Sequence, residues 1–142
     1  MRLVMIARSY IKQARARLDD AYDAYKEGNY PYAVRLSQEC VELCLKAALK
    51  VVGIEYPKVH DVSGVFPSFK QRFPRWFQVE LDYLSESSKI LVRKRGPSLY
   101  GGEDTFLSPD EVIGEADAKD AVERAEKAYN LCRKLVEELG GS

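Results

Sequence analysis

A short basic stretch in the second half of the chain carries side chains suited to binding an anion. Arg93, Lys94 and Arg95 are consecutive, and glycines and a proline follow them up to residue 102. Because glycine and proline interrupt regular structure, we expect residues 93–108 to be irregular and the basic residues to end the preceding helix. There they would complement the negative end of the helix dipole, while glycine amides could approach a phosphate. The alternative is an ordinary surface helix end followed by a loop.

Two other side chains, Tyr100 and His60, could bind a ligand or move a proton. Tyr100 lies in the glycine-rich stretch, where its ring could stack on a base, its hydroxyl could donate a hydrogen bond, or the side chain could anchor the segment. His60, the single histidine, could act as a general base near neutral pH. The other interpretation makes it a helix-start residue that is hydrogen-bonded locally, with Asp61 or Ser63 as the cap.

The sequence offers no recognised motif for metal, cofactor or nucleophilic chemistry. It lacks the metalloprotease, phosphate-loop and dinucleotide patterns and any nucleophile elbow. Cys40 and Cys44 are four residues apart and share a helical face, but a zinc site needs about four ligands. We therefore expect the cysteines to be small core residues, with no metal and no cofactor.

Helical periodicity dominates the elements that must position these residues. We expect a first helix of about 25 residues ending at Gly28-Asn29, a second over about 31–52, a short one over about 65–73, and a fourth over about 75–92. Ser108, Pro109 and Glu111 form a capping-box signature that should open the last helix, which runs to Gly140. The sequence thus predicts one all-α domain over residues 1–142, an up-down bundle of four long helices plus one short helix.

Two patterns within these helices bear on the core and on the site. Phe66, Phe69 and Phe73 would lie along one side of the short helix, where core packing is the favoured interpretation and base stacking the other. In the second helix a polar stripe runs along the otherwise apolar surface. The stripe is typical of a solvated face, and a cleft or dimer surface is the alternative. Its members are Arg35, Glu39, Glu42, Lys46 and Lys50.

The charges balance over the whole chain but not along it. Lys and Arg number 22, as do Asp and Glu, so the formal charge is zero. Residues 1–102 carry 17 basic and 11 acidic side chains, whereas residues 103–126 carry two basic and nine acidic ones. The neutral total argues against a general polyanion binder and leaves room for one local phosphate site. We expect no signal peptide or membrane span, and the odd cysteine count favours the cytoplasm.

The order of these features resembles the HEPN domain family, small helical domains of archaea and bacteria. The resemblance rests on residues 14–51, with the turn at residues 25–33 and the helix around residues 38–47. It continues through His60, the stretch Leu99–Gly102 and the Ser108-Pro109 helix start. The resemblance implies an up-down helical bundle that pairs as a homodimer, with the functional cleft at or near the dimer interface.

Many members of the family are toxins of toxin–antitoxin pairs. They cleave RNA without metal through an arginine followed four to six residues later by histidine. The matching positions in this chain are Arg95 and Tyr100, so the arginine is present and tyrosine replaces the histidine. Since tyrosine is a poor general base at neutral pH, the resemblance leaves the ribonuclease activity open. Members encoded beside minimal nucleotidyltransferases lack the full motif and are thought to bind nucleotide or substrate with that partner.

Two function classes follow from the residues and the resemblance. The favoured hypothesis is a nucleotide- or RNA-binding module that dimerises and works with a nucleotidyltransferase-type partner, using Arg93, Arg95, Tyr100 and His60 to contact the ligand. A related one makes Tyr100 a site that such a partner nucleotidylates. The alternative is a metal-independent endoribonuclease in which Arg95 acts with Tyr100 or His60. A helical-repeat scaffold is a weaker third option, because no 34-residue repeat follows the tetratricopeptide-like turn.

Overall fold

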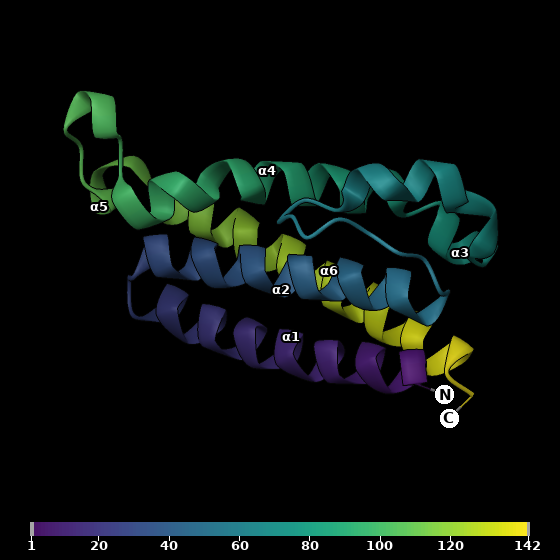
Figure 1. Ribbon diagram of the computed structural model, residues 1–142. Helices are drawn as coiled ribbons and strands as arrows, with labels where there is room; N and C mark the ends of the chain where they lie inside the picture. Colours follow the sequence, from purple (N-terminus) through teal and green to yellow (C-terminus); the bar gives the residue numbers. More distant parts are fainter. Residues whose placement is uncertain (1, 142) are drawn as a thin grey trace.

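Four long helices form an up-down bundle in the computed structural model, which describes residues 2–141 (Figure 1). Each long helix runs opposite to the one before it, so that both ends of the chain lie at one end of the bundle. The predicted all-α class and topology are therefore confirmed. The helices are α1 (Arg2–Lys26), α2 (Tyr30–Val51), α4 (Leu81–Tyr100) and α6 (Glu115–Leu139).

Shorter helical segments connect the long helices, and they are more numerous than the single short helix expected. A 3₁₀ segment with a kink at Phe69 replaces the predicted helix over 65–73. The expected helix over 75–92 is divided at residues 79–80, so that one turn precedes α4. The short segments are η1 (Ser63–Arg72), α3 (Arg75–Gln78), η2 (Glu103–Thr105) and α5 (Pro109–Val112).

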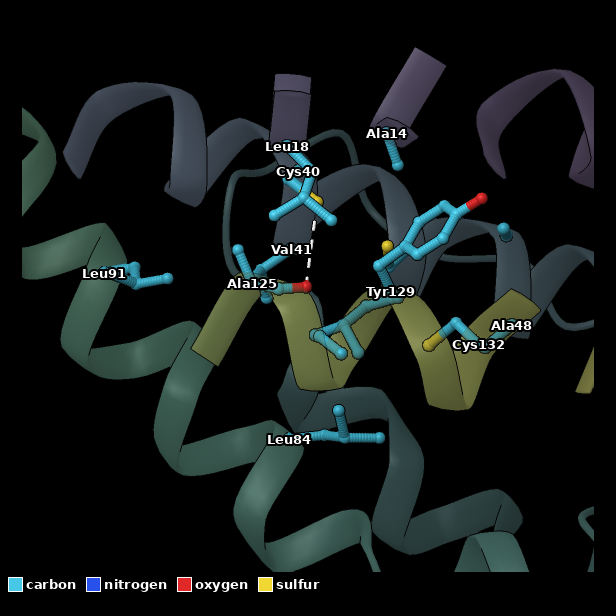
Figure 2. Close-up of a cluster of buried hydrophobic side chains, with 14 of the residues drawn as sticks. Ala14, Leu18, Cys40, Val41, Ala48, Leu84, Leu91, Ala125, Tyr129 and Cys132 are labelled. Carbon is cyan, nitrogen blue, oxygen red and sulfur yellow. Dashed lines mark hydrogen bonds between the residues drawn. The ribbon is translucent and has the colours of Figure 1, made fainter. Parts of the chain in front are cut away.

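Helix α2 is the centre of the bundle and lies against α1, α4 and α6. It is the most apolar helix and is rich in small side chains, which let its neighbours approach closely. Figure 2 shows α1, α2, α4 and α6 contributing to one cluster, in which the Cys40 thiol lies 3.9 Å from the backbone oxygen of Ala125. Cys40, Cys44 and Cys132 are free and buried, as expected, and burial raises the pKa of the Cys44 thiol.

The prediction of an irregular segment from residue 93 is wrong for its first eight residues. Helix α4 continues through Gly96 and Pro97 to Tyr100. Tertiary packing overrides the local signal, because Ser98 is buried and Arg95 Nη1 donates to Gln38 Oε1 of α2 at 2.7 Å. The three basic residues at 93–95 therefore lie inside a helix, and neither the helix dipole nor glycine amides support an anion there.

The capping box at Ser108 is confirmed, but it opens one helical turn only. The Ser108 hydroxyl accepts from the Glu111 amide at 3.3 Å, and Glu111 accepts from the Ser108 amide at 3.1 Å. The chain then becomes extended at buried Ile113 and starts again in α6. There Asp117 accepts from the Gly114 amide at 3.0 Å, so two successive N-terminal caps replace the one predicted.

The segment between α4 and α5 projects beyond the bundle at the end opposite the termini (Figure 1). Gly102 and Leu107 close it by pairing their backbones. Its tip holds Phe106, whose side chain is 94% exposed. Within residues 2–141, no helix is both long enough and apolar enough to cross a membrane.

Candidate functional site

A surface pocket of about 230 Å³ brings together two of the residues singled out in the sequence, Arg95 and His60. Arg95 comes from α4, and His60 comes from the segment between α2 and η1. The stripe of polar residues on α2 lies between them, and Arg17 of α1 lies at the same pocket. The stripe therefore lines a cleft for part of its length, which was the less expected of its two interpretations.

Arg95 is held against α2 by two side chains. Its Nη1 donates to Gln38 Oε1 at 2.7 Å and lies 3.4 Å from Glu39 Oε2. The Arg95 side chain is only 24% exposed, whereas Gln38 is fully enclosed, with 1% of its surface exposed. A buried amide that accepts from a guanidinium fixes the direction in which that guanidinium points.

His60 occupies the other side of the pocket and contacts Glu42 of α2. Its Nδ1 lies 2.8 Å from Glu42 Oε1, which also accepts from Gln38 Nε2 at 2.9 Å. Lys46 donates to the other Glu42 oxygen at 2.9 Å. Burial alone would raise the pKa of Glu42, but hydrogen bonds from Gln38, Lys46 and His60 outweigh it and lower that pKa. Gln38 and Glu42 thus connect Arg95 to His60 without a break.

The local interpretation of His60 is wrong in its partner and in its cap, because Val62 is the N-cap of η1 and its side chain makes no capping hydrogen bond. His60 contacts a residue 18 positions earlier in the chain. Asp61 lies two residues before the first residue of η1 and accepts from the amide of Ser63 at 3.0 Å and from its hydroxyl at 2.6 Å. The Ser88 hydroxyl of α4 also donates to Asp61 at 2.7 Å, which ties this segment to the bundle.

Asp61 should make stability depend on pH in the acid range. Burial raises its pKa, but the hydrogen bonds from Ser63 and Ser88 outweigh burial, and the net shift is downward. A lowered folded-state pKa stabilises the fold above the unfolded value of about 3.9, and this contribution is lost as pH falls through the folded-state pKa. We expect Asp61→Asn to flatten the acid limb of stability against pH, measured by urea unfolding from about pH 5 to 2. Exposed Asp104→Asn is the control, and equal acid limbs for both variants would contradict the assignment.

Arg93 and Tyr100 lie apart from this pocket. They are seven residues apart on α4, which is close to two helical turns, so they share one side of the helix. Arg95 points to a different side, about 200° around the helix from Arg93. Tyr100 is 67% exposed, Arg93 is exposed, and neither lines the pocket. The predicted site residues therefore fall into two groups, Arg95 with His60 and Arg93 with Tyr100.

Sequence reasoning did not assign the residues that join Arg95 to His60. Glu39 and Glu42 belong to the polar stripe, and that stripe was the available signal. Gln38 had a weaker signal, as a polar residue beside the most apolar row of α2. No signal in the sequence indicated Arg17, because this residue follows the ordinary alternation of charge on α1.

A second pocket extends the site past His60. It has a volume of about 570 Å³ and shares Glu42 and His60 with the first. Lys46 and Lys58 also line it. A third pocket of about 300 Å³ lies toward the start of α2, where Tyr32 and Arg35 contribute to its wall. The stripe of α2 thus borders three neighbouring hollows, with basic side chains at each.

These observations define a class of protein: an all-α up-down bundle with an arginine and a histidine at one cleft. The model of the HEPN domain family matches residues 7–135, and the chain belongs to this family. This confirms the resemblance, which spans nearly the whole sequence.

Individual relatives agree in length and shape. The chain is 29% identical to a protein of Methanocaldococcus jannaschii named "Putative toxin MJ1304", over 97% of this chain and 93% of that protein. The crystal structure of ST0689, an archaeal HEPN homologue, superimposes with a TM-score of 0.68 at 25% identity, covering 92% and 97% of the two chains. That of TT1696 from Thermus thermophilus gives 0.70 at 22% identity over 90% and 96%, and shares the fold.

Proposed function

We propose that this HEPN domain binds a phosphate-bearing ligand, a nucleotide or RNA, in the pocket where Arg95 and His60 meet. The observation that carries the proposal is their convergence on one cleft from elements far apart in the sequence. Around that cleft and the two pockets beside it, Arg17, Arg35 and Arg95 pair with Glu39, and Lys46 pairs with Glu42. Four basic side chains against two carboxylates leave an excess of positive charge, which suits an anion.

A toxin-like role with a protein partner is the biological setting we propose. The M. jannaschii relative named as a toxin supports this setting, since it matches over almost its full length. We extend the proposal to a homodimer that acts with a nucleotidyltransferase-type partner in the cytoplasm. The buried free cysteines agree with a reducing compartment. Light scattering during size-exclusion chromatography tests the dimer, and a nucleotidyl-transfer assay on the co-purified complex tests the partner.

Removing the Arg95 side chain should weaken binding strongly. A charge-assisted hydrogen bond contributes about 1.5–3 kcal/mol, so Arg95→Ala should lower affinity for a short oligoribonucleotide by roughly tenfold to a hundredfold. Fluorescence anisotropy at fixed salt measures the effect. Arg133→Ala is the matched control, because this half-exposed arginine of α6 also pairs with a carboxylate. Equal affinities for the two variants would refute the proposed pocket.

A metal-independent ribonuclease is the second candidate, and one observation favours a particular form of it. His60 shares the Arg95 pocket and Tyr100 does not, so the general base in such an enzyme would be His60. Arg95 would stabilise the phosphate in the transition state. RNA cleavage in EDTA that is lost in both Arg95→Ala and His60→Gln, but kept in Tyr100→Phe, would establish this form. If the wild type binds RNA but does not cleave it, the ribonuclease candidate fails and the binding module remains.

A further inference from the structure

Three arginines from three different helices converge on one carboxylate, that of Glu39. Arg17 of α1 places Nε 3.4 Å from Glu39 Oε1. Arg35, on α2 itself, and Arg95 of α4 reach the other oxygen at 3.3 and 3.4 Å. The Glu39 side chain is 22% exposed, and the three arginine side chains are 24–39% exposed. The cluster is therefore open to solvent on one side and enclosed on the other.

The cluster holds more positive charge than its carboxylate can neutralise. Three guanidinium groups face one Glu39, so the net charge is +2. The next carboxylate along the helix, Glu42, is already bound to Lys46, Gln38 and His60. Guanidinium groups match the geometry of carboxylate and phosphate alike, because both present paired oxygens to their N–H forks. The oxygens of Glu39 thus lie where those of a phosphate group would be bound.

We infer that Arg17, Arg35 and Arg95 form a subsite for a terminal phosphate group, and that Glu39 competes with the ligand for it. The inference rests on the proposed function and adds Arg17, Arg35 and Glu39 to it. A phosphomonoester carries a charge of about −1.5 to −2 at neutral pH, which matches the excess of the cluster. An internal phosphodiester carries one negative charge and would leave part of the excess uncompensated. The subsite thus prefers the phosphorylated end of a chain to its interior.

The space around the cluster fits a ligand that extends beyond its phosphate. The pocket of about 230 Å³ lies beside Arg17 and Arg95. The one of about 300 Å³ lies beside Arg35, and the half-exposed ring of Tyr32 at its wall can stack on a base. The phosphate end would lie at the arginines, and the nucleoside part would enter one of these two pockets.

The role of Glu39 as a competitor is tested by neutralising it and, as a control, by neutralising a matched carboxylate elsewhere. Glu39→Gln and Glu137→Gln each remove a carboxylate that pairs with an arginine four residues earlier, Arg35 and Arg133 respectively. The probes are one oligoribonucleotide sequence with a 5′-phosphate, with a 3′-phosphate, or with neither. We expect the wild type to prefer one phosphorylated form. Glu39→Gln should raise affinity for that form about fivefold or more, and Glu137→Gln should change it less than twofold.

The arginines are tested separately from the competitor. Arg17→Gln and Arg35→Gln should each abolish the preference for the phosphorylated oligoribonucleotide, with the variants shown to be folded by circular dichroism. An affinity of Glu39→Gln that equals or falls below that of Glu137→Gln would overturn the role of Glu39 as a competitor. Equal binding of all three probes by the wild type would overturn the terminal-phosphate subsite.

The outcomes also separate this inference from the proposed function. If Arg95→Ala loses affinity for every probe while Arg17→Gln and Arg35→Gln behave as wild type, the proposed pocket stands and the subsite fails. If neither an oligoribonucleotide nor a mononucleotide binds, the proposed function fails. Inorganic phosphate then tests the subsite alone, through the Nε–H signals of the three arginines in nuclear magnetic resonance spectra. Shifts at those signals that Arg17→Gln removes support the subsite, and unchanged signals refute it.

Discussion

Phe77→Ala should lower the free energy of unfolding by about 3–5 kcal/mol, the range typical of removing a buried aromatic ring. The Phe77 side chain is fully buried. Its ring centroid lies 5.1 Å from that of Phe73, 6.5 Å from that of Phe66, and 5.7 Å from that of Trp76, which meets it edge-on. Alanine would lose these contacts and leave a cavity, because the surrounding rings come from η1, from the residue that follows it and from α3, and cannot all move inward.

The matched control for Phe77 is a phenylalanine with almost no contacts. Phe106 is 94% exposed at the tip of the projecting segment, so Phe106→Ala should change the unfolding free energy by less than about 0.5 kcal/mol. Urea unfolding followed by circular dichroism measures both variants. A loss below about 1 kcal/mol in Phe77→Ala would show that the aromatic cluster is not part of the cooperative core.

Gly101→Ala is expected to have the second largest effect, about 2–5 kcal/mol. Gly101 ends α4 with φ of +73° and ψ of −155°, a backbone conformation that is essentially restricted to glycine. An added Cβ would also collide with the backbone oxygen of Leu107 and lie 2.8 Å from the carbonyl carbon of Ser108. Since these atoms belong to the backbone, they cannot rotate away. The projecting segment would have to open.

Gly28→Ala serves as a control that separates the backbone strain expected in Gly101→Ala from the collision of the added Cβ. Gly28 has φ of +78°, but an added Cβ would meet no other atom within 4 Å. It should therefore cost only the conformational strain of about 1–2 kcal/mol. Thermal unfolding compares the two variants. Hydrogen exchange at the paired amides of Gly102 and Leu107 should accelerate in Gly101→Ala alone. Similar losses in both variants would mean that the segment adjusts to the extra methyl group.

Helical periodicity was a reliable guide wherever a helix has one face in the core. It gave the extents of α1 and α2 closely, because their apolar rows meet a neighbour along their whole length. It failed at residues 93–100, where Gly96 and Pro97 indicate an irregular segment. There the burial of Ser98 and the contact of α4 with α2 keep the chain helical. Such contacts join residues far apart in the sequence, and a local pattern does not contain them.

The residues of the candidate site could be predicted from the sequence, but which of them share a pocket could not. Arg95 and His60 could be named from their chemistry. Their joint use of one pocket depends on Gln38, which lies 57 residues before Arg95. The grouping of Arg93 and Arg95 as one basic end followed from expecting the helix to end at about residue 92. Once that stretch is helical, the two side chains point to different sides, and Lys94 between them pairs with Asp117 of α6 at 2.9 Å.

The buried amide of Gln38 also determines from which direction a ligand can reach Arg95. Its oxygen takes one donor of Arg95 Nη1, and the opposite end of the same amide donates to Glu42. An approach that pulled Nη1 away would leave a buried oxygen without a donor, at a cost of about 1–3 kcal/mol. Nη1 carries two hydrogens, so a ligand that replaces Glu39 at the second one, or that engages Nε and Nη2, leaves the bond to Gln38 intact and avoids that cost. The enclosed amide beneath Arg95 therefore favours the approaches that keep this bond, and it makes the cleft directional.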